Sequence, residues 1–114
     1  MAVLVIADVQ GQTPEGYDKM LAALETELKE APGFIAHGAG PSADGWKTFE
    51  VWDTLSEATR FFAGYVRPLL PEGVMPKRTI VELDALVVGP LATLLQERDV
   101  DTYVPGLSRL VPAR

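Results

Sequence analysis

Hydrophobic and polar positions recur along the chain with two periods, and together they predict six elements. Residues 2–10 are rich in Val and Ile and are followed by Gly11, a pattern typical of a strand. Thr13 and Pro14 suit the start of a helix, and Pro32-Gly33 suits its end. Between them lies one apolar stripe with helical spacing, formed by Tyr17, Met20, Leu21, Leu24, Leu28 and Ala31.

The middle of the chain predicts a hairpin followed by a second helix. Residues 34–39 and 46–53 read as short strands, and the turn-forming residues 40–45 join them. The segment 54–57 is a capping box, which marks the start of a helix. The apolar face expected for this helix consists of Leu55, Ala58, Phe61, Phe62, Tyr65, Val66 and Leu69.

The remaining residues predict a loop, a last strand, a short helix and a tail, over 71–78, 79–88, 91–98 and 99–114 respectively. The order strand, helix, strand, strand, helix, strand is that of the ferredoxin-like α+β fold. We therefore expect one ferredoxin-like domain over 1–89, with a four-stranded antiparallel sheet and both helices on one face. Residues 90–114 are expected to be a C-terminal extension of that domain.

The sheet face without helices is expected to need a cover. Both faces carry apolar groups: in the first strand Val3 and Val5 oppose Leu4 and Ile6, and in the third strand Phe49 and Val51 oppose Trp46 and Trp52. A large exposed apolar patch is unusual for a monomer. The sequence favours a homodimer that pairs the two sheets. The alternative is that the chain's own C-terminal tail covers this face.

Composition excludes several kinds of site. The chain has 114 residues, a formal net charge of −6, no cysteine and one histidine. The negative charge argues against nucleic acid and anionic membranes as partners. Without cysteine there is no disulfide or thiolate chemistry, and one histidine excludes a multi-histidine metal site within one chain. We expect no metal and no cofactor, and, since no signal peptide or membrane span is recognisable, a cytoplasmic protein.

The hairpin register decides which side chains share a sheet face. If the turn consists of residues 41–44, His37 faces Thr48, and opposing residues lie on the same side of the sheet. Period two then places five side chains together, namely His37, Trp46, Thr48, Glu50 and Trp52. A turn of three or five residues would instead put His37 on the opposite face.

Several short motifs resemble one known family. They are Ala31-Pro-Gly-Phe34, Gly45-Trp46, the segment from Phe49 to Glu57, and Arg60-Phe-Phe62. Together they resemble the antibiotic biosynthesis monooxygenases, a branch of the dimeric α/β-barrel proteins, over about residues 2–89. The resemblance implies a dimer and a pocket between sheet and helices. It also implies oxidation of a polyphenolic or polyketide-like compound by molecular oxygen without metal, haem or flavin.

The family's site residues carry over only in part. Its tryptophan near the end of the third strand corresponds to Trp52, its asparagine to Thr48 and its helix tyrosine to Ala58. Tyr65, on the same helix face, offers a phenol from another position. In the haem-degrading branch of the resembled family, the site consists of an Asn, a Trp and a His. This chain contains no asparagine, which argues against haem degradation.

Each candidate residue has a catalytic and a structural interpretation. Histidine titrates near neutrality, so His37 is the candidate base, and Glu50 would orient it; otherwise both are ordinary sheet residues. Catalytic roles fall to His37, Trp52 and Thr48, and substrate binding to Trp46, Glu50, Phe61, Phe62 and Tyr65. For the aromatic residues, packing in the core or at an interface is the favoured interpretation. Arg67 and Lys77-Arg78 suit either an anionic substrate or a solvated surface.

Three functions remain open. The first is a cofactor-independent monooxygenase acting on a small aromatic or polyketide-like compound. The second is a non-catalytic dimeric barrel that binds a small hydrophobic ligand or serves a stress response. The third is haem binding with His37 as the axial ligand.

Overall fold

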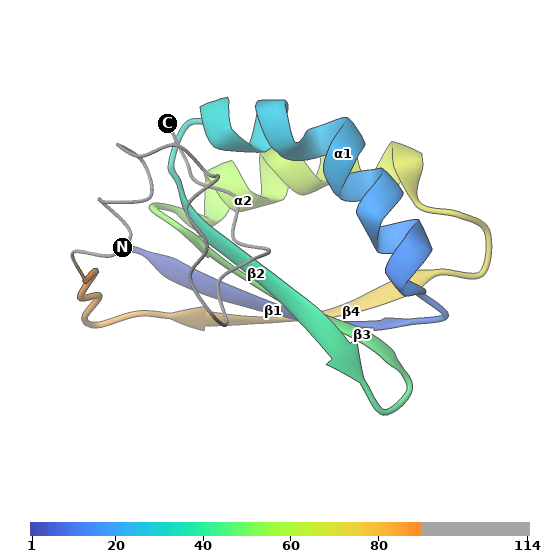
Figure 1. Cartoon of the computed structure of the whole chain (residues 1–114). Coiled ribbons are helices and arrows are strands. Elements are labelled where there is room, and N and C mark those ends of the chain that lie inside the picture. The colour runs from blue at the N-terminus through green and yellow to red at the C-terminus, as the bar shows by residue number, and fades with distance from the viewer. Residues whose placement is uncertain (90–114) are drawn as a thin grey trace.

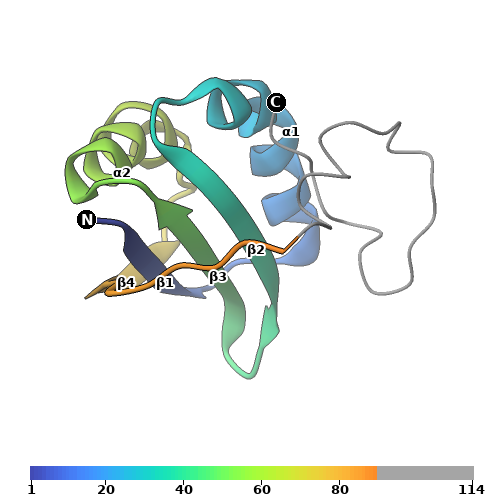
Figure 2. The same ribbon diagram turned by 90° about the vertical axis from the view of Figure 1, so that its left-hand side faces the viewer.

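The computed structural model describes residues 1–89. They form two layers, a sheet and a pair of helices that covers one of its faces (Figures 1 and 2). The elements are β1 (Val3–Gln10), α1 (Pro14–Glu30), β2 (Phe34–Ser42), β3 (Gly45–Trp52), α2 (Leu55–Phe61) and β4 (Met75–Glu82). The strand order is β2-β3-β1-β4, with every neighbouring pair antiparallel. The predicted ferredoxin-like fold is confirmed, while the expected helix 91–98 and tail 99–114 lie outside the described residues.

Local signals explain where the helices begin. The Thr13 hydroxyl accepts a hydrogen bond from the Gly16 backbone N–H at 3.0 Å, so Thr13 caps α1. The Thr54 hydroxyl accepts from the Glu57 N–H at 3.2 Å and donates to the Glu57 carboxylate at 2.9 Å. Both predicted starts are therefore confirmed.

The second helix departs from the predicted single stripe. After Phe61 it continues as a π-helical turn, Phe62–Val66, and a 3₁₀ turn, Arg67–Leu69. Pro68 has no N–H with which to extend an α-helix, and the wider π turn shifts the angular position of the residues in it. Ala58 and Phe61 are buried as expected, whereas Leu55, Tyr65 and Leu69 are exposed.

The hairpin register differs from the predicted one by two residues. Ser42 pairs with Gly45, so the turn has two residues, and His37 pairs with Glu50 rather than with Thr48. A shift of two residues keeps every side chain on the same face because the strand period is two. The predicted pairs were wrong, but the predicted grouping on one face is confirmed.

The last strand begins and ends earlier than predicted. β4 starts at Met75, inside the expected loop, because residues 75–78 pair with the second half of β1. It tolerates Pro76 because it is an edge strand. It ends at Glu82, which pairs with Val3 at the beginning of β1, so later residues have no partner on that strand.

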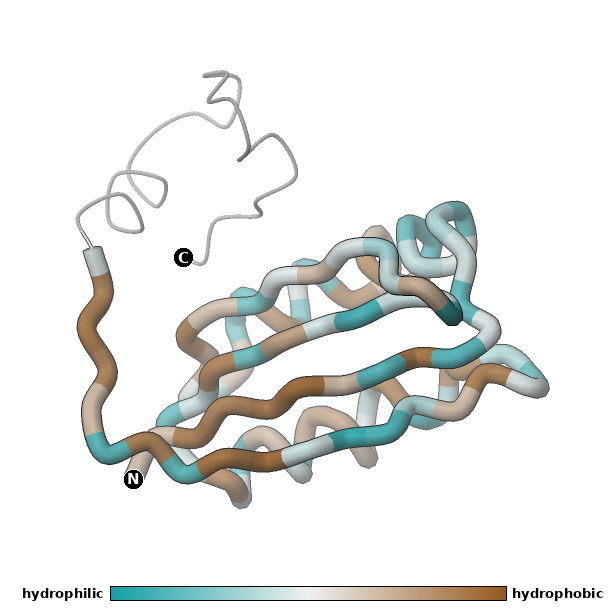
Figure 3. The backbone as a smooth tube through the Cα atoms, turned by 90° about the horizontal axis from the view of Figure 1, so that it is seen from below, coloured by the Kyte–Doolittle hydropathy of each residue, from teal (hydrophilic) through white to brown (hydrophobic). Residues whose placement is uncertain are grey.

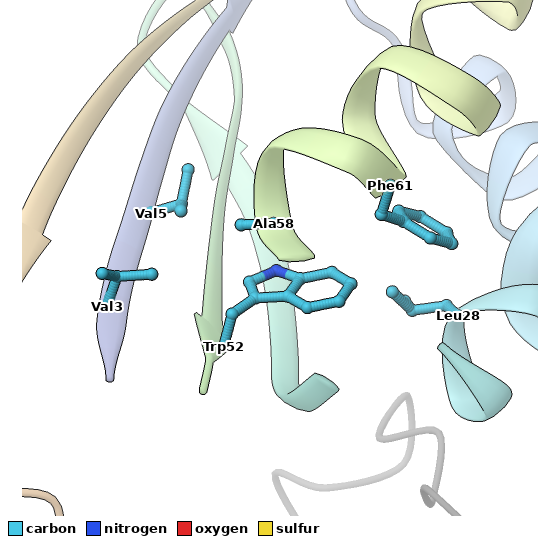
Figure 4. Packing of buried hydrophobic residues seen from close by; sticks show 6 residues of the cluster. All are labelled: Val3, Val5, Leu28, Trp52, Ala58 and Phe61. Carbon is cyan, nitrogen blue, oxygen red and sulfur yellow. The ribbon is translucent and has the colours of Figure 1, made fainter. Parts of the chain in front are cut away.

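The core between the layers has two clusters. One contains Val3, Val5, Leu28, Trp52, Ala58 and Phe61, and Figure 4 shows the Trp52 indole lying between the strands and the helix residues. The other contains Ala7, Val9, Trp46 and Val74. The inward positions of β1 thus contribute to both clusters.

Within residues 1–89 no helix covers the opposite face of the sheet, which we call the open sheet face (Figure 3). Register places Leu4 beside Val51 and Val81, and Ile6 beside Phe49. The Phe49 ring is 46 % exposed and lies over Gly38, where a Cβ would collide with it. Across residues 1–89, no helix combines the length and apolar character needed to cross a membrane.

Candidate active site

Four side chains between the sheet and the helices form one hydrogen-bonded network. Tyr17 Oη of α1 lies 2.6 Å from His37 Nε2 of β2, and His37 Nδ1 lies 3.0 Å from Glu50 Oε2 of β3. The Trp52 indole N–H donates to Glu50 Oε1 at 2.9 Å. Direct pairing of His37 with Glu50 across the hairpin, and the period of two between Glu50 and Trp52, bring these groups together.

The donors and acceptors of this network determine where its protons lie. An ionised Glu50 carboxylate only accepts hydrogen bonds, so Trp52 Nε1 and His37 Nδ1 must both donate to it. A neutral imidazole protonated on Nδ1 has its lone pair on Nε2. In that neutral form His37 Nε2 accepts from the Tyr17 hydroxyl, whereas in the imidazolium form both ring nitrogens donate.

Glu50 stays ionised although it is largely buried. Burial alone would raise its pKa, but the hydrogen bond and charge of His37, the Trp52 N–H and the charge of Arg78 together lower it below the ordinary glutamate value. The ionised Glu50 carboxylate accepts from His37 Nδ1 and thereby orients the imidazole ring. The His37–Glu50 pair can thus act as a general base.

A cavity of about 110 Å³ lies beside this network, between the sheet and the helices. Its wall is mostly apolar, with Met20, Leu21 and Leu24 on α1 and Phe62 and Val66 on the π turn. The polar residues that line it are Gln12, Tyr17, His37, Thr48, Glu50 and Arg78. An apolar cavity with a few convergent polar groups is typical of a small-molecule site.

Arg78 brings a positive charge to the same cavity. Its guanidinium lies 4.2 Å from the centroid of the Phe62 ring, a cation–π contact. Burial lowers the pKa of Arg78, nearby Glu50 opposes that change, and Arg67 adds to it. Arginine remains protonated in proteins, so Glu50 and Arg78 bring a negative and a positive charge to the cavity among residues 1–89.

Most of the predicted site residues meet at this cavity. It is lined by His37, Trp46, Thr48, Glu50, Phe61 and Phe62. Trp52 is 0 % exposed and contacts Glu50 from the core instead of lining the cavity. Tyr65 lies outside it, 49 % exposed and against Phe61.

Sequence reasoning missed Tyr17 and Gln12 and left Arg78 undecided. Tyr17 falls within the apolar stripe of α1 and was interpreted as core. The available signal was its hydroxyl, the one polar group on that stripe. Within the described part of the chain there is no cluster of three or more metal-ligating side chains.

Comparisons with known proteins give structural neighbours only. No protein-family model matches the sequence, and no curated protein matches it. Among solved structures, SnoaB, a cofactor-independent oxygenase from Streptomyces nogalater, aligns with a TM-score of 0.60 and 15 % identity, over 75 % of this chain and 96 % of that one.

Two further neighbours have no stated activity. The NE2512 protein of unknown function from Nitrosomonas europaea aligns with a TM-score of 0.56 and 16 % identity, over 77 % of this chain and 92 % of that one. A conserved protein from Methanosarcina mazei Go1 aligns with a TM-score of 0.54 and 18 % identity, over 71 % of this chain and 91 % of that one. At such identities the likeness concerns the fold. The chain has the ferredoxin-like fold, which it shares with SnoaB.

Proposed function

We propose that this protein is a cofactor-independent monooxygenase acting on a small aromatic compound with an acidic hydroxyl group. The observation that carries the proposal is the position of His37. Its ring is oriented by Glu50 and lines an apolar cavity that also holds Thr48 and Arg78. This arrangement can remove a proton from a bound phenol and stabilise the anion that forms.

The chemistry needs no electron donor beyond the substrate. A phenolate is electron-rich and can reduce molecular oxygen. A carbon para to the hydroxyl gains one oxygen atom and becomes a carbonyl, and the other oxygen atom leaves as water. The substrate supplies all four electrons and becomes a quinone. The protein contributes the base, the anion-stabilising groups and a cavity of low polarity.

Cavity size favours a substrate with one ring. About 110 Å³ is less than the roughly 150 Å³ of an apolar cavity known to bind benzene. A single-ring phenol requires small side-chain movements, whereas three fused rings require Met20 or Phe62 to move aside. We therefore expect single-ring phenols to react faster than dithranol.

The experiment measures oxygen uptake and quinone absorbance with purified protein, using substituted phenols, 1-naphthol and dithranol. Wild type is expected to exceed the uncatalysed rate, and His37→Gln and Thr48→Val to lose most of that excess. Tyr65→Phe is the matched control because Tyr65 lies outside the cavity. Equal rates for wild type and His37→Gln would contradict the proposal.

A second function, ligand binding without turnover, is favoured by two positions. Thr48 and Ala58 stand where the resembled family has an asparagine and a tyrosine. Without the asparagine amide and the tyrosine hydroxyl, the cavity would still bind a ligand but would have fewer polar groups to take part in catalysis. Stoichiometric binding of a phenol in calorimetry, without oxygen uptake, would support this function over the first.

We also propose that the protein forms a homodimer through the open sheet face. That face carries Leu4, Ile6 and Phe49, and the ion pair of Lys47 with Asp8 at 3.4 Å lies on it as well. A two-fold axis would bury the apolar groups and allow the two charges to pair with their counterparts. Light scattering should give twice the chain mass, and Phe49→Glu should give a monomer. A monomeric wild type would instead favour cover by residues 90–114.

A further inference from the structure

Tyr17 stands between the proposed base and its ligand. The Tyr17 hydroxyl lies 2.6 Å from His37 Nε2, the nitrogen that would receive a proton from a substrate. Both side chains line the cavity. A ligand hydroxyl must therefore displace Tyr17 from His37 or act through it.

We propose that Tyr17 contacts the ligand hydroxyl and passes its proton to His37, so that Tyr17, His37 and Glu50 form a proton relay. This inference rests on the proposed function, because it names the group that performs the first step. A phenolic oxygen donates one hydrogen bond and also accepts. Tyr17 can thus donate to His37 while it receives a proton from the ligand.

The relay moves protons and changes no oxidation state. The ligand O–H bond breaks as Tyr17 Oη takes the proton, and the Tyr17 O–H bond breaks as His37 Nε2 takes the proton that Tyr17 carried. Tyr17 ends as a neutral phenol. The products are a ligand anion in the cavity and an imidazolium beside the Glu50 carboxylate.

The packing of Tyr17 favours a relay over displacement. Its ring lies nearly parallel to the imidazole, at an interplanar angle of 4°, and packs against the Trp46 ring with centroids 5.2 Å apart. Rotating Tyr17 out would break the contact with Trp46. It would also remove the hydrogen bond to a His37 side chain that is only 16 % exposed, which is costly for a buried polar group.

The charged groups around the relay match the charges that it creates. Glu50 on β3 lies at the His37 end and stabilises the imidazolium. Arg78 on β4 lines the ligand cavity and stabilises an anion there. Tyr17 on α1 connects the two. Charge separation thus occurs between a fixed anion and a fixed cation.

The test uses 4-nitrophenol, a single-ring phenol whose anion absorbs visible light. Its ionisation is measured when bound to wild type, Tyr17→Phe and the control Tyr65→Phe. We expect the bound probe to ionise at least tenfold more readily on wild type and Tyr65→Phe than on Tyr17→Phe. Binding to all three proteins with equal or greater ionisation on Tyr17→Phe would overturn the relay and leave the proposed function standing. No binding to wild type would overturn both.

A second measurement needs no variant. His37 is the only histidine of the chain, so ¹⁵N-histidine labelling gives a single imidazole in the NMR spectrum. Without ligand, Nδ1 is expected to carry the proton and Nε2 to accept. Formation of the bound 4-nitrophenolate should convert both nitrogens to the imidazolium type. A bound anion formed while His37 remains neutral would overturn the relay even if Tyr17→Phe fails to fold.

Discussion

The two tryptophans of β3 point to the same side of the sheet, yet their surroundings differ. Trp52 is 0 % exposed, lies among Val3, Leu28 and Phe61, and donates its N–H to Glu50. Trp46 is 6 % exposed and lines the cavity, and its N–H has no hydrogen-bond partner among residues 1–89.

This difference separates stability from binding along a single strand. The Trp52 end is filled and its polar group is satisfied, as expected for a core. The Trp46 end has unfilled volume and an unsatisfied donor, features that cost stability and are common at functional sites. Glu50 connects the core to the cavity. One of its oxygens accepts from the buried Trp52, and the other accepts from His37, which lines the cavity together with Trp46.

The largest expected effect is that of Trp52→Ala. Removing a fully buried indole should lower the free energy of unfolding by about 3–5 kcal/mol. Trp46→Ala should cost clearly less, because it borders an existing cavity and removes an unsatisfied donor. Urea unfolding followed by far-ultraviolet circular dichroism measures both variants without relying on tryptophan fluorescence. Equal losses would mean that the two ends do not differ in packing.

Glu50→Gln should give the next largest effect. It removes a charged acceptor of two hydrogen bonds and should cost about 1.5–3 kcal/mol at pH 7. Because folding lowers the pKa of Glu50 from its usual 4.5, the unfolded state binds more protons near that pH. The contribution of Glu50 is therefore complete above pH 4.5 and is lost as the pH falls through the lower, folded pKa.

Unfolding of both proteins from pH 7 down to pH 3 tests this sign. The stability gap between wild type and Glu50→Gln should narrow towards acid. Glu57→Gln is a suitable control, since Glu57 accepts from the Thr54 hydroxyl at the start of α2 and takes no part in the hydrogen bonds of Glu50 with His37 and Trp52. A gap that widens below pH 4.5 would show that Glu50 is not stabilised as an anion.

Much of this arrangement could be predicted from the sequence, and the reasons are local. Strand period two placed His37, Glu50 and both tryptophans on one face, and capping residues marked both helix starts. The hairpin pairing was wrong because residues 40–45 contain several turn formers, which suit more than one turn length. That error of two residues left the predicted face intact.

Contacts between layers could not be predicted in the same way. Tyr17 meets His37 only because α1 crosses the sheet at a particular angle and height, which the period of a helix does not specify. The extent of β4 depended on where β1 ends, and the direction of Tyr65 depended on a π turn. In each case the missing information was the position of one element relative to another.

The smallest expected effect is that of Trp46→Phe, and Trp52→Phe is its matched comparison. Trp46→Phe removes an indole N–H without a partner among the described residues, and this relief offsets the lost ring area. Its free energy of unfolding should stay within about 1 kcal/mol of wild type. Trp52→Phe makes the same chemical change but breaks a hydrogen bond to a carboxylate, at a cost of about 1.5–3 kcal/mol. If the two variants were equally stable, the satisfied and unsatisfied N–H groups would not be what distinguishes the two ends of β3.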